Sequence, residues 1–356
     1  MRRPLLFSAA LLLLTGVALA EDPSSPAAYL AVVMDSKLHY NMVAKPSKTP
    51  VQVQVCPRRD ETMRVVVDGA KKSLRPWSLK IEVPKLLAEG ETLFQAEDYE
   101  GAAAKYKAAI ELDPEAAPAY LFYGDALLMG AMQPAEALAQ YQKAVALDPT
   151  LPSAHFFSST AYGLLGRKAD AREEIIRALT YYPSYAAVWK VATQNPGAWG
   201  IKPVTRHRFE PPAGFIGVAG KDGIDVFGGA NGEWLGYALC KAVWANEPQF
   251  KARHSNGGWS VEEEHACVVN QIVGAFNKTE AALEKENKPH GEKYVIAAMP
   301  PLEAHIWEAA EAGLLDGYIL FEIIGTHCPL ALSAMSDGAR DQVDAYIRKY
   351  LIVPAN

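Results

Sequence analysis

Apolar residues recur at three- and four-residue intervals between residues 83 and 183, and this spacing predicts paired helices. The clearest marker is a bulky residue, an alanine three positions later and a proline five positions after that. These markers are Tyr106, Ala109 and Pro114, then Tyr141, Ala144 and Pro149, then Ile175, Ala178 and Pro183. The prolines are 35 and then 34 residues apart, close to the ~34-residue period of a two-helix repeat. The pattern therefore predicts a helical solenoid.

Small residues precede large ones at fixed positions in each copy, which permits close approach of neighbouring helices. On the first helix the small and large positions are Gly90 and Leu93, Gly124 and Leu127, and Ser159 and Tyr162. On the second helix the small residues are Ala102, Ala137 and Ala171. This arrangement resembles the tetratricopeptide repeat (TPR) family over about three copies. Copy two carries one extra residue, which we expect in the turn from Gly130 to Pro134.

The resemblance implies a concave groove, lined by the first helices of the repeats, that holds a peptide. Its positions carry over to Leu87, Glu91, Phe94 and Gln95, to Leu121, Asp125, Leu128 and Met129, and to Phe156, Thr160 and Leu164. None is the Lys, Arg or Asn with which one class of TPR protein clamps a C-terminal carboxylate. An apolar groove with two acids favours an apolar or basic segment as ligand. Alternatively, the chain's own N-terminal strands or C-terminal domain fill the groove.

The segment before the repeats, residues 21–82, has a β-type pattern. Residues 51–55 alternate strictly, residues 63–67 are rich in β-branched side chains, and residues 78–83 alternate again. These runs predict short strands in a small sheet or a set of hairpins. So few strands would need to pack against the helices.

The segment after the repeats begins with one further helix that contains Trp189 and ends at Asn195-Pro196-Gly197. We interpret it as a helix that caps the array, so the solenoid spans residues 83–197. Residues 198–356 predict a separate α-rich domain with one β-hairpin formed by residues 215–218 and 224–227. The predicted fold is mostly α.

The first 20 residues have the features of a secretory signal peptide. Arg2 and Arg3 precede an apolar run, and Ala18-Leu19-Ala20 forms a small-x-small cleavage site before Glu21. A retained membrane anchor is disfavoured because the run is shorter than the ~20 apolar residues that a span needs. We therefore expect an exported protein, periplasmic or extracellular, with no membrane span after cleavage of the signal peptide.

The composition narrows the choice of partner. The formal net charge is −6 and no block of Lys or Arg occurs, so nothing indicates nucleic acid or an anionic membrane as a ligand. Half of the residues are hydrophobic, which at this length supports two or three cores.

Four cysteines, Cys56, Cys240, Cys267 and Cys328, are available for disulfides in an exported protein. Four cysteines allow three full pairings. If the helices that carry Cys240 and Cys267 form an antiparallel hairpin, the two side chains lie at matching height beside the connecting loop. We therefore predict a Cys240–Cys267 disulfide, which would leave Cys56 to pair with Cys328.

Candidate catalytic or metal-binding residues are sparse. The pairs Glu262/His265 and His305/Glu308 each share a helix face, and His327 adds a further imidazole. However, no HExxH, CxxC or GxSxG motif occurs, so no catalytic, cofactor or metal residue is assigned. Because the repeat is a binding scaffold, we favour a non-catalytic protein–protein interaction scaffold of the cell envelope or exterior. The alternative is an exported, metal-dependent enzyme whose C-terminal domain holds the site and whose repeats recruit substrate.

Overall fold

The computed structural model describes residues 26–43, 63–68, 71–210, 218–219, 223–229, 232–254, 261–333 and 335–355. The chain forms two compact units, each built from segments that are far apart in the sequence. The first, which we call the sheet unit, consists of Met1–Val53 and His207–Ile323. The second, the repeat unit, consists of Gln54–Arg206 and Ile324–Asn356.

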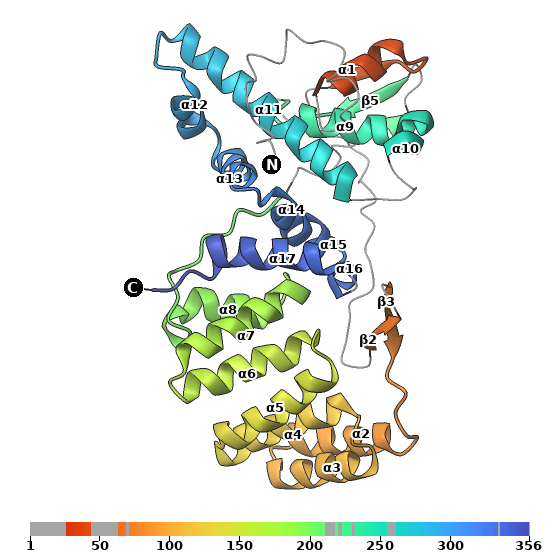
Figure 1. The fold of residues 1–356 in the computed structure, drawn as a ribbon, viewed down its shortest axis with the longest axis vertical. Coiled ribbons are helices and arrows are strands. Elements are labelled where there is room, and N and C mark those ends of the chain that lie inside the picture. The colour runs from red at the N-terminus through yellow and green to blue at the C-terminus, as the bar shows by residue number, and fades with distance from the viewer. Residues whose placement is uncertain are drawn as a thin grey trace. The chain divides into compact units, whose positions relative to one another are not determined.

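Six helices of the repeat unit form three successive pairs (Figure 1). They are α2 (Val83–Gln95) with α3 (Tyr99–Leu112), α4 (Ala117–Ala131) with α5 (Pro134–Leu147), and α6 (Pro152–Leu164) with α7 (Lys168–Tyr181). Asp113 and Asp148 end α3 and α5 in extended backbone, because the proline that follows each of them disfavours helical geometry. The predicted mostly α fold with a helical solenoid is confirmed.

The extra residue of copy two lies in the last turn of α4. There the Gln133 N–H donates to Leu127 O, six residues earlier, at 3.2 Å. The equivalent bonds of the other copies span five residues, from Asp98 N to Leu93 O and from Arg167 N to Tyr162 O. The helix therefore absorbs the insertion by widening its final turn, and Met132 follows in left-handed backbone with φ 49°.

The end of the array is covered by residues from the C-terminus as well as by the expected capping helix. That helix is α8 (Ala186–Gln194), followed by the 3₁₀ helix η1 (Pro196–Ala198). The returning segment consists of α15 (Gly325–His327), α16 (Pro329–Ser333), α17 (Asp337–Tyr346) and the π-helical η3 (Ile347–Leu351). Of these, α16, α17 and η3 lie against α7. The chain end then pairs with the linker, since the Lys202 N–H donates to Val353 O at 2.8 Å.

The sheet unit combines a small sheet with a layer of helices. Its strands are β1 (Tyr40–Val43), β4 (Val218–Ala219) and β5 (Ile224–Phe227), in the order β1-β5-β4. Its helices are α1 (Pro26–Asp35), α9 (Leu235–Asn246), α10 (Pro248–His254), α11 (Val261–Lys285), α12 (Glu292–Ala298), α13 (Pro301–Glu311), α14 (Leu315–Tyr318) and the π-helical η2 (Ile319–Ile324). β4 and β5 are antiparallel, as expected for the predicted hairpin, whereas β1 runs parallel to β5.

The units divide the chain differently from the boundaries that the sequence suggested. Parallel pairing of Tyr40 with Ile224 brings part of the predicted N-terminal segment into the sheet unit, and the last residues of the predicted C-terminal domain belong to the repeat unit. A four-residue strand is not stable alone, and its partner is too distant for any local pattern to reveal.

The N-terminal strand predictions have mixed outcomes. Residues 63–67 lie in β2 (Met63–Asp68), which pairs antiparallel with β3 (Lys71–Pro76). The strand predicted for residues 78–83 is wrong, because residues 78–82 form a loop and turn and Val83 begins α2. Their backbone is instead held by a side chain of the array, where the Lys80 N–H donates to Asp113 Oδ2 at 3.1 Å. Residues 51–55 lie outside the described residues.

The predicted Cys240–Cys267 disulfide is present and joins α9 to α11. The two helices pack against each other, as the predicted hairpin geometry required. Cys56 lies outside the described residues, so its pairing with Cys328 stays a prediction. The predicted signal peptide also lies outside them. Within the described ranges, no helix has both the length and the apolar character needed to cross a membrane.

Candidate functional site

The predicted groove positions lie on three neighbouring helices of the repeat unit. Neighbouring helices α2, α4 and α6 carry all of them, and we call this surface the first-helix face. The positions are Leu87, Glu91, Phe94 and Gln95 on α2, Leu121, Asp125, Leu128 and Met129 on α4, and Phe156, Thr160 and Leu164 on α6. Leu121 and Leu128 are buried at 1% and 7% exposure, so they pack the array. Gln95, Met129 and Leu164 are exposed, and the other six are half-buried.

Both acids of the first-helix face accept hydrogen bonds from tyrosines of the second helices. The Tyr141 hydroxyl donates to Asp125 Oδ1 at 2.8 Å, and the Tyr106 hydroxyl donates to Glu91 Oε2 at 3.5 Å. Burial, together with the nearby carboxylates, raises the pKa of both tyrosines well above their usual range. The hydroxyls therefore stay protonated and continue to donate.

Glycines make room for these tyrosine rings. A Cβ atom on Gly90 would lie 2.4 Å from the ring of Tyr106, and a Cβ atom on Gly124 would lie 2.4 Å from the ring of Tyr141. Copy three has Ser159, Thr160 and Ile175 at the glycine, acid and tyrosine positions. Copy three therefore lacks the tyrosine ring, and it also lacks both the glycine that makes room for the ring and the acid that accepts from its hydroxyl. The acids are therefore part of the packing between helices.

The most exposed apolar side chains of the face lie at the ends of two first helices. Met129 on α4 and Leu164 on α6 occupy equivalent positions and are 55% and 53% exposed. Met132 and Leu165, in the turns that follow, are 62% and 39% exposed. The repeat pattern identified Met129 and Leu164 as groove positions. It did not identify Met132 and Leu165, because they follow the first helices to which the groove positions belong.

Comparison with family models agrees with the paired helices. A family model described as TPR repeat matches residues 90–130. The helical pairs are tetratricopeptide repeats. Among solved structures, the chain is similar to the TPR2B domain of yeast Sti1 in its complex with pHsp70, at 25% identity and a TM-score of 0.30. The match covers 34% of this chain and 94% of that one. No curated protein sequence matched the chain.

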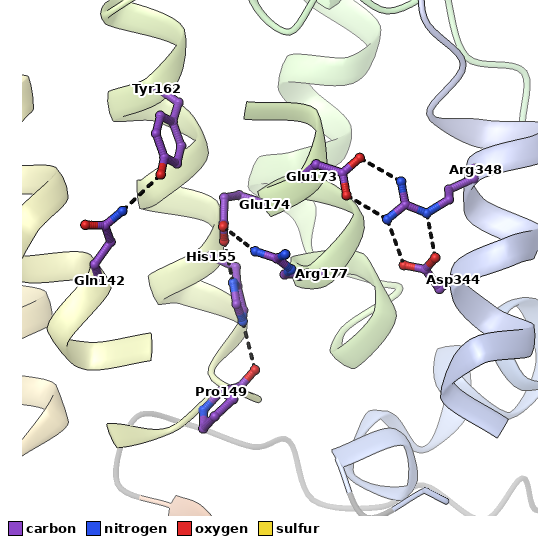
Figure 2. Close-up of polar contacts among 9 residues, drawn as sticks. All are labelled: Gln142, Pro149, His155, Tyr162, Glu173, Glu174, Arg177, Asp344 and Arg348. Atoms are coloured by element: carbon purple, nitrogen blue, oxygen red, sulfur yellow. Dashed lines mark hydrogen bonds and ion pairs between the residues drawn. The ribbon is translucent and has the colours of Figure 1, made fainter. Parts of the chain in front are cut away.

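The last TPR repeat carries a polar cluster beside the C-terminal helix (Figure 2). Both amino groups of Arg348 bond the carboxylate of Glu173 on α7 at 2.7 Å, and Arg348 Nε bonds Asp344 Oδ2 at 2.5 Å. Hydrogen bonding to Arg348 lowers the pKa of Glu173. This bidentate pair fixes α17 and η3 against the TPR array.

A pocket of about 440 Å³ lies beside this cluster, lined by Val145, Pro149, His155, Arg177, Thr180, Tyr181, Arg340, Asp341 and Asp344. His155 is buried, with Nε2 2.9 Å from Pro149 O and Nδ1 2.6 Å from Glu174 Oε2. A carbonyl oxygen only accepts, so Nε2 carries a proton. With both ring nitrogens used, His155 ties α6 to α7 and has no nitrogen left for a ligand.

The residues considered for a metal site are not brought together. His265 Nδ1 lies 2.7 Å from Asp316 Oδ1, and the ring of His305 stacks on His207 with centroids 4.4 Å apart. Burial and the neighbouring His207 lower the pKa of His305 to about 4. His327 belongs to the other unit. In the part of the chain that the structure describes, no cluster of three or more potential metal ligands occurs.

A buried ionic network in the sheet unit was not anticipated from the sequence. Lys241 Nζ on α9 bonds the carboxylates of Glu263 and Glu264 on α11, and the Tyr237 hydroxyl donates to Glu264 Oε2 at 2.7 Å. Burial alone would lower the pKa of Lys241, but the two carboxylates raise it, so the amine stays charged. Glu263 and Glu264 belong to an acidic run, a pattern that usually indicates a solvated helix start.

Proposed function

We propose that the protein is an exported TPR scaffold that binds a partner protein in the cell envelope or exterior. The observation that carries the proposal is the first-helix face, where successive repeats present exposed apolar side chains at equivalent positions. Large apolar side chains that remain in water on a folded surface are typical of docking sites. Export rests on the signal-peptide pattern of the first 20 residues.

The ligand is an apolar segment of the partner. Met129 and Leu164 supply the exposed anchors, with Phe94 and Phe156 half-buried on the same face. The carboxylate of Glu91 already accepts bonds from Tyr106 and from Gln95, whose Nε2 lies 3.0 Å away. The acids therefore disfavour an acidic ligand by charge but offer little hydrogen-bonding capacity of their own. Affinity then comes mainly from burial of apolar side chains.

Exchange of the exposed anchors tests this surface. The variant M129Q/L164Q changes two side chains that are more than half exposed, so it should fold as the wild type does. The matched control is I81Q, because Ile81 is 87% exposed in the same unit but lies outside the first-helix face. Partners that copurify with the wild type from the source's exported fraction are quantified for each variant. We expect loss with M129Q/L164Q and retention with I81Q.

Retention of the partners by M129Q/L164Q would place the binding surface outside the first-helix face. If M129Q/L164Q retains every partner at wild-type yield, the first-helix face is not the binding surface. Export is measured separately, by sequencing the N-terminus of the protein recovered from outside the cytoplasm. We expect a mature chain that starts at Glu21. Recovery only of the uncut chain in the cytoplasm would refute export.

A further inference from the structure

The sheet unit has a pocket of its own. An open pocket of about 360 Å³ is bordered by α1, β1, α9 and α11 and lined by Tyr29, Leu30, Met42, Leu235, Gly236, Leu239, Asn270, Val273, Gly274 and Asn277. Its size lies within the range of about 300–1,000 Å³ that small-molecule sites occupy, and such sites are mostly apolar with a few placed polar groups. We propose that this pocket binds a neutral, apolar small molecule with one hydroxyl group at its polar end.

The floor of the pocket is fixed before any ligand arrives. The helices α9 and α11 are joined by the disulfide between Cys240 and Cys267. They approach so closely at Gly236 that a Cβ there would lie 3.0 Å from Asn270 O. Asn270 Nδ2 also donates to Gly236 O at 2.6 Å. A rigid floor reduces the entropy that a ligand must overcome on binding.

The apolar walls are accessible to water. Leu30 on α1 is 55% exposed and Met42 on β1 is 46% exposed. Gly274 on α11 also lines the pocket, and a Cβ at that position would meet no atom within 4 Å. Burial of this apolar surface under a ligand is favourable, and the methionine can adjust its shape to the bound chain.

The polar side chains of the pocket determine which polar group the ligand can carry. No charged residue lines the pocket among the described residues, so a carboxylate or an ammonium group would lose water without gaining a counterion. Asn270 Nδ2 uses one of its two hydrogens on Gly236 O, so the Asn270 amide keeps one N–H donor and the acceptor Oδ1. A hydroxyl on the ligand, which both donates and accepts, matches both groups.

The test uses 1-decanol as the probe, with the full-length protein and ligand-observed NMR titration. We expect a single site with Kd below about 1 mM. The variant G274L places a side chain in the empty space beside Gly274 and should weaken binding at least about tenfold, with G274A in between. The matched control is G338L on α17, another helical glycine with no atom within 4 Å of its Cβ position, and its affinity should be unchanged.

Three results would overturn the proposal. The first is absence of saturable binding of 1-decanol to the wild type. The second is equal affinity in G274L while its circular dichroism and thermal transition match the wild type. The third comes from charged probes. Decanoate and decylammonium should each bind at least about tenfold more weakly than 1-decanol, because neither finds a counterion. Tighter binding of either ion would refute the neutral ligand class.

Discussion

The contact between Gly124 and Tyr141 allows a quantitative test of how the TPR pairs are packed. In G124A the new methyl group would lie 2.4 Å from a ring carbon of Tyr141. That ring is fully buried and its hydroxyl is held by Asp125, so it cannot swing aside without loss of the bond. Overpacking costs about 1–3 kcal/mol and a displaced hydrogen bond about 1 kcal/mol. The better helix propensity of alanine returns about 1 kcal/mol.

We therefore expect G124A to lower the free energy of unfolding by roughly 1–3 kcal/mol. The matched control is G163A on α6, where the nearest atom to the added Cβ is Ala198 O at 3.4 Å. That variant should be neutral or stabilised by up to ~1 kcal/mol. Copy three provides the rescue, because it pairs Ser159 with Ile175. The double variant G124S/Y141I should lose less stability than the sum of its single variants, with a coupling energy of about 0.5–3 kcal/mol.

The assay is urea denaturation of the full-length protein, with hydrogen exchange of peptides from α4 and α5 to assign the change to the array. Hydrogen exchange is needed because two units do not have to unfold in one transition. Equal stabilities of G124A and G163A would refute the steric argument. If the stability loss of G124S/Y141I equals the sum of the losses of its single variants, serine and isoleucine do not replace the glycine–tyrosine packing.

Three further predictions concern the rest of the chain. R348A should increase hydrogen exchange in α17 and η3. It should change global stability by no more than ~1 kcal/mol, because the Arg348–Glu173 pair is partly exposed. The control R208A, which removes another exposed arginine, should leave hydrogen exchange in α17 and η3 unchanged. The stability of the sheet unit should be constant above pH ~6.5 and fall toward pH ~4, because unfolded His305 gains a proton that the folded ring resists. H305N should flatten this slope, whose total we place at roughly 1–2 kcal/mol after allowing for solvent screening. C240S/C267S should lower stability by about 2–4 kcal/mol in urea titrations, and a loss smaller than with R348A would contradict the role given to the disulfide.

Local features of the sequence predicted local structure well. The recurring Tyr106 and Tyr141 positions predicted the repeats, because every repeat uses the same short-range helix contacts. The Cys240–Cys267 disulfide followed from matching heights on two consecutive helices. In both cases the interacting residues are close in sequence, so the pattern contains both partners.

Long-range pairings left no such signal. The pairing of Tyr40 with Ile224 and of Arg348 with Glu173 joins residues more than 170 positions apart. The sequence around these residues contains no motif that would indicate their partners. Within the first-helix face, the sequence did not show that Leu121 is buried or that Asp125 is held by Tyr141. Those details depend on the distance between two helices, which residue type alone does not determine.

The interleaving of the two units has a consequence for the order in which the chain can fold. During synthesis from the N-terminus, β1 must wait for β5, and the surface of α7 must wait for the last residues of the chain. Each unit needs a segment from the N-terminal part of the chain and a segment from the C-terminal part. Neither unit can therefore finish folding until its C-terminal segment has been made. A chain cut between the units would leave both of them incomplete.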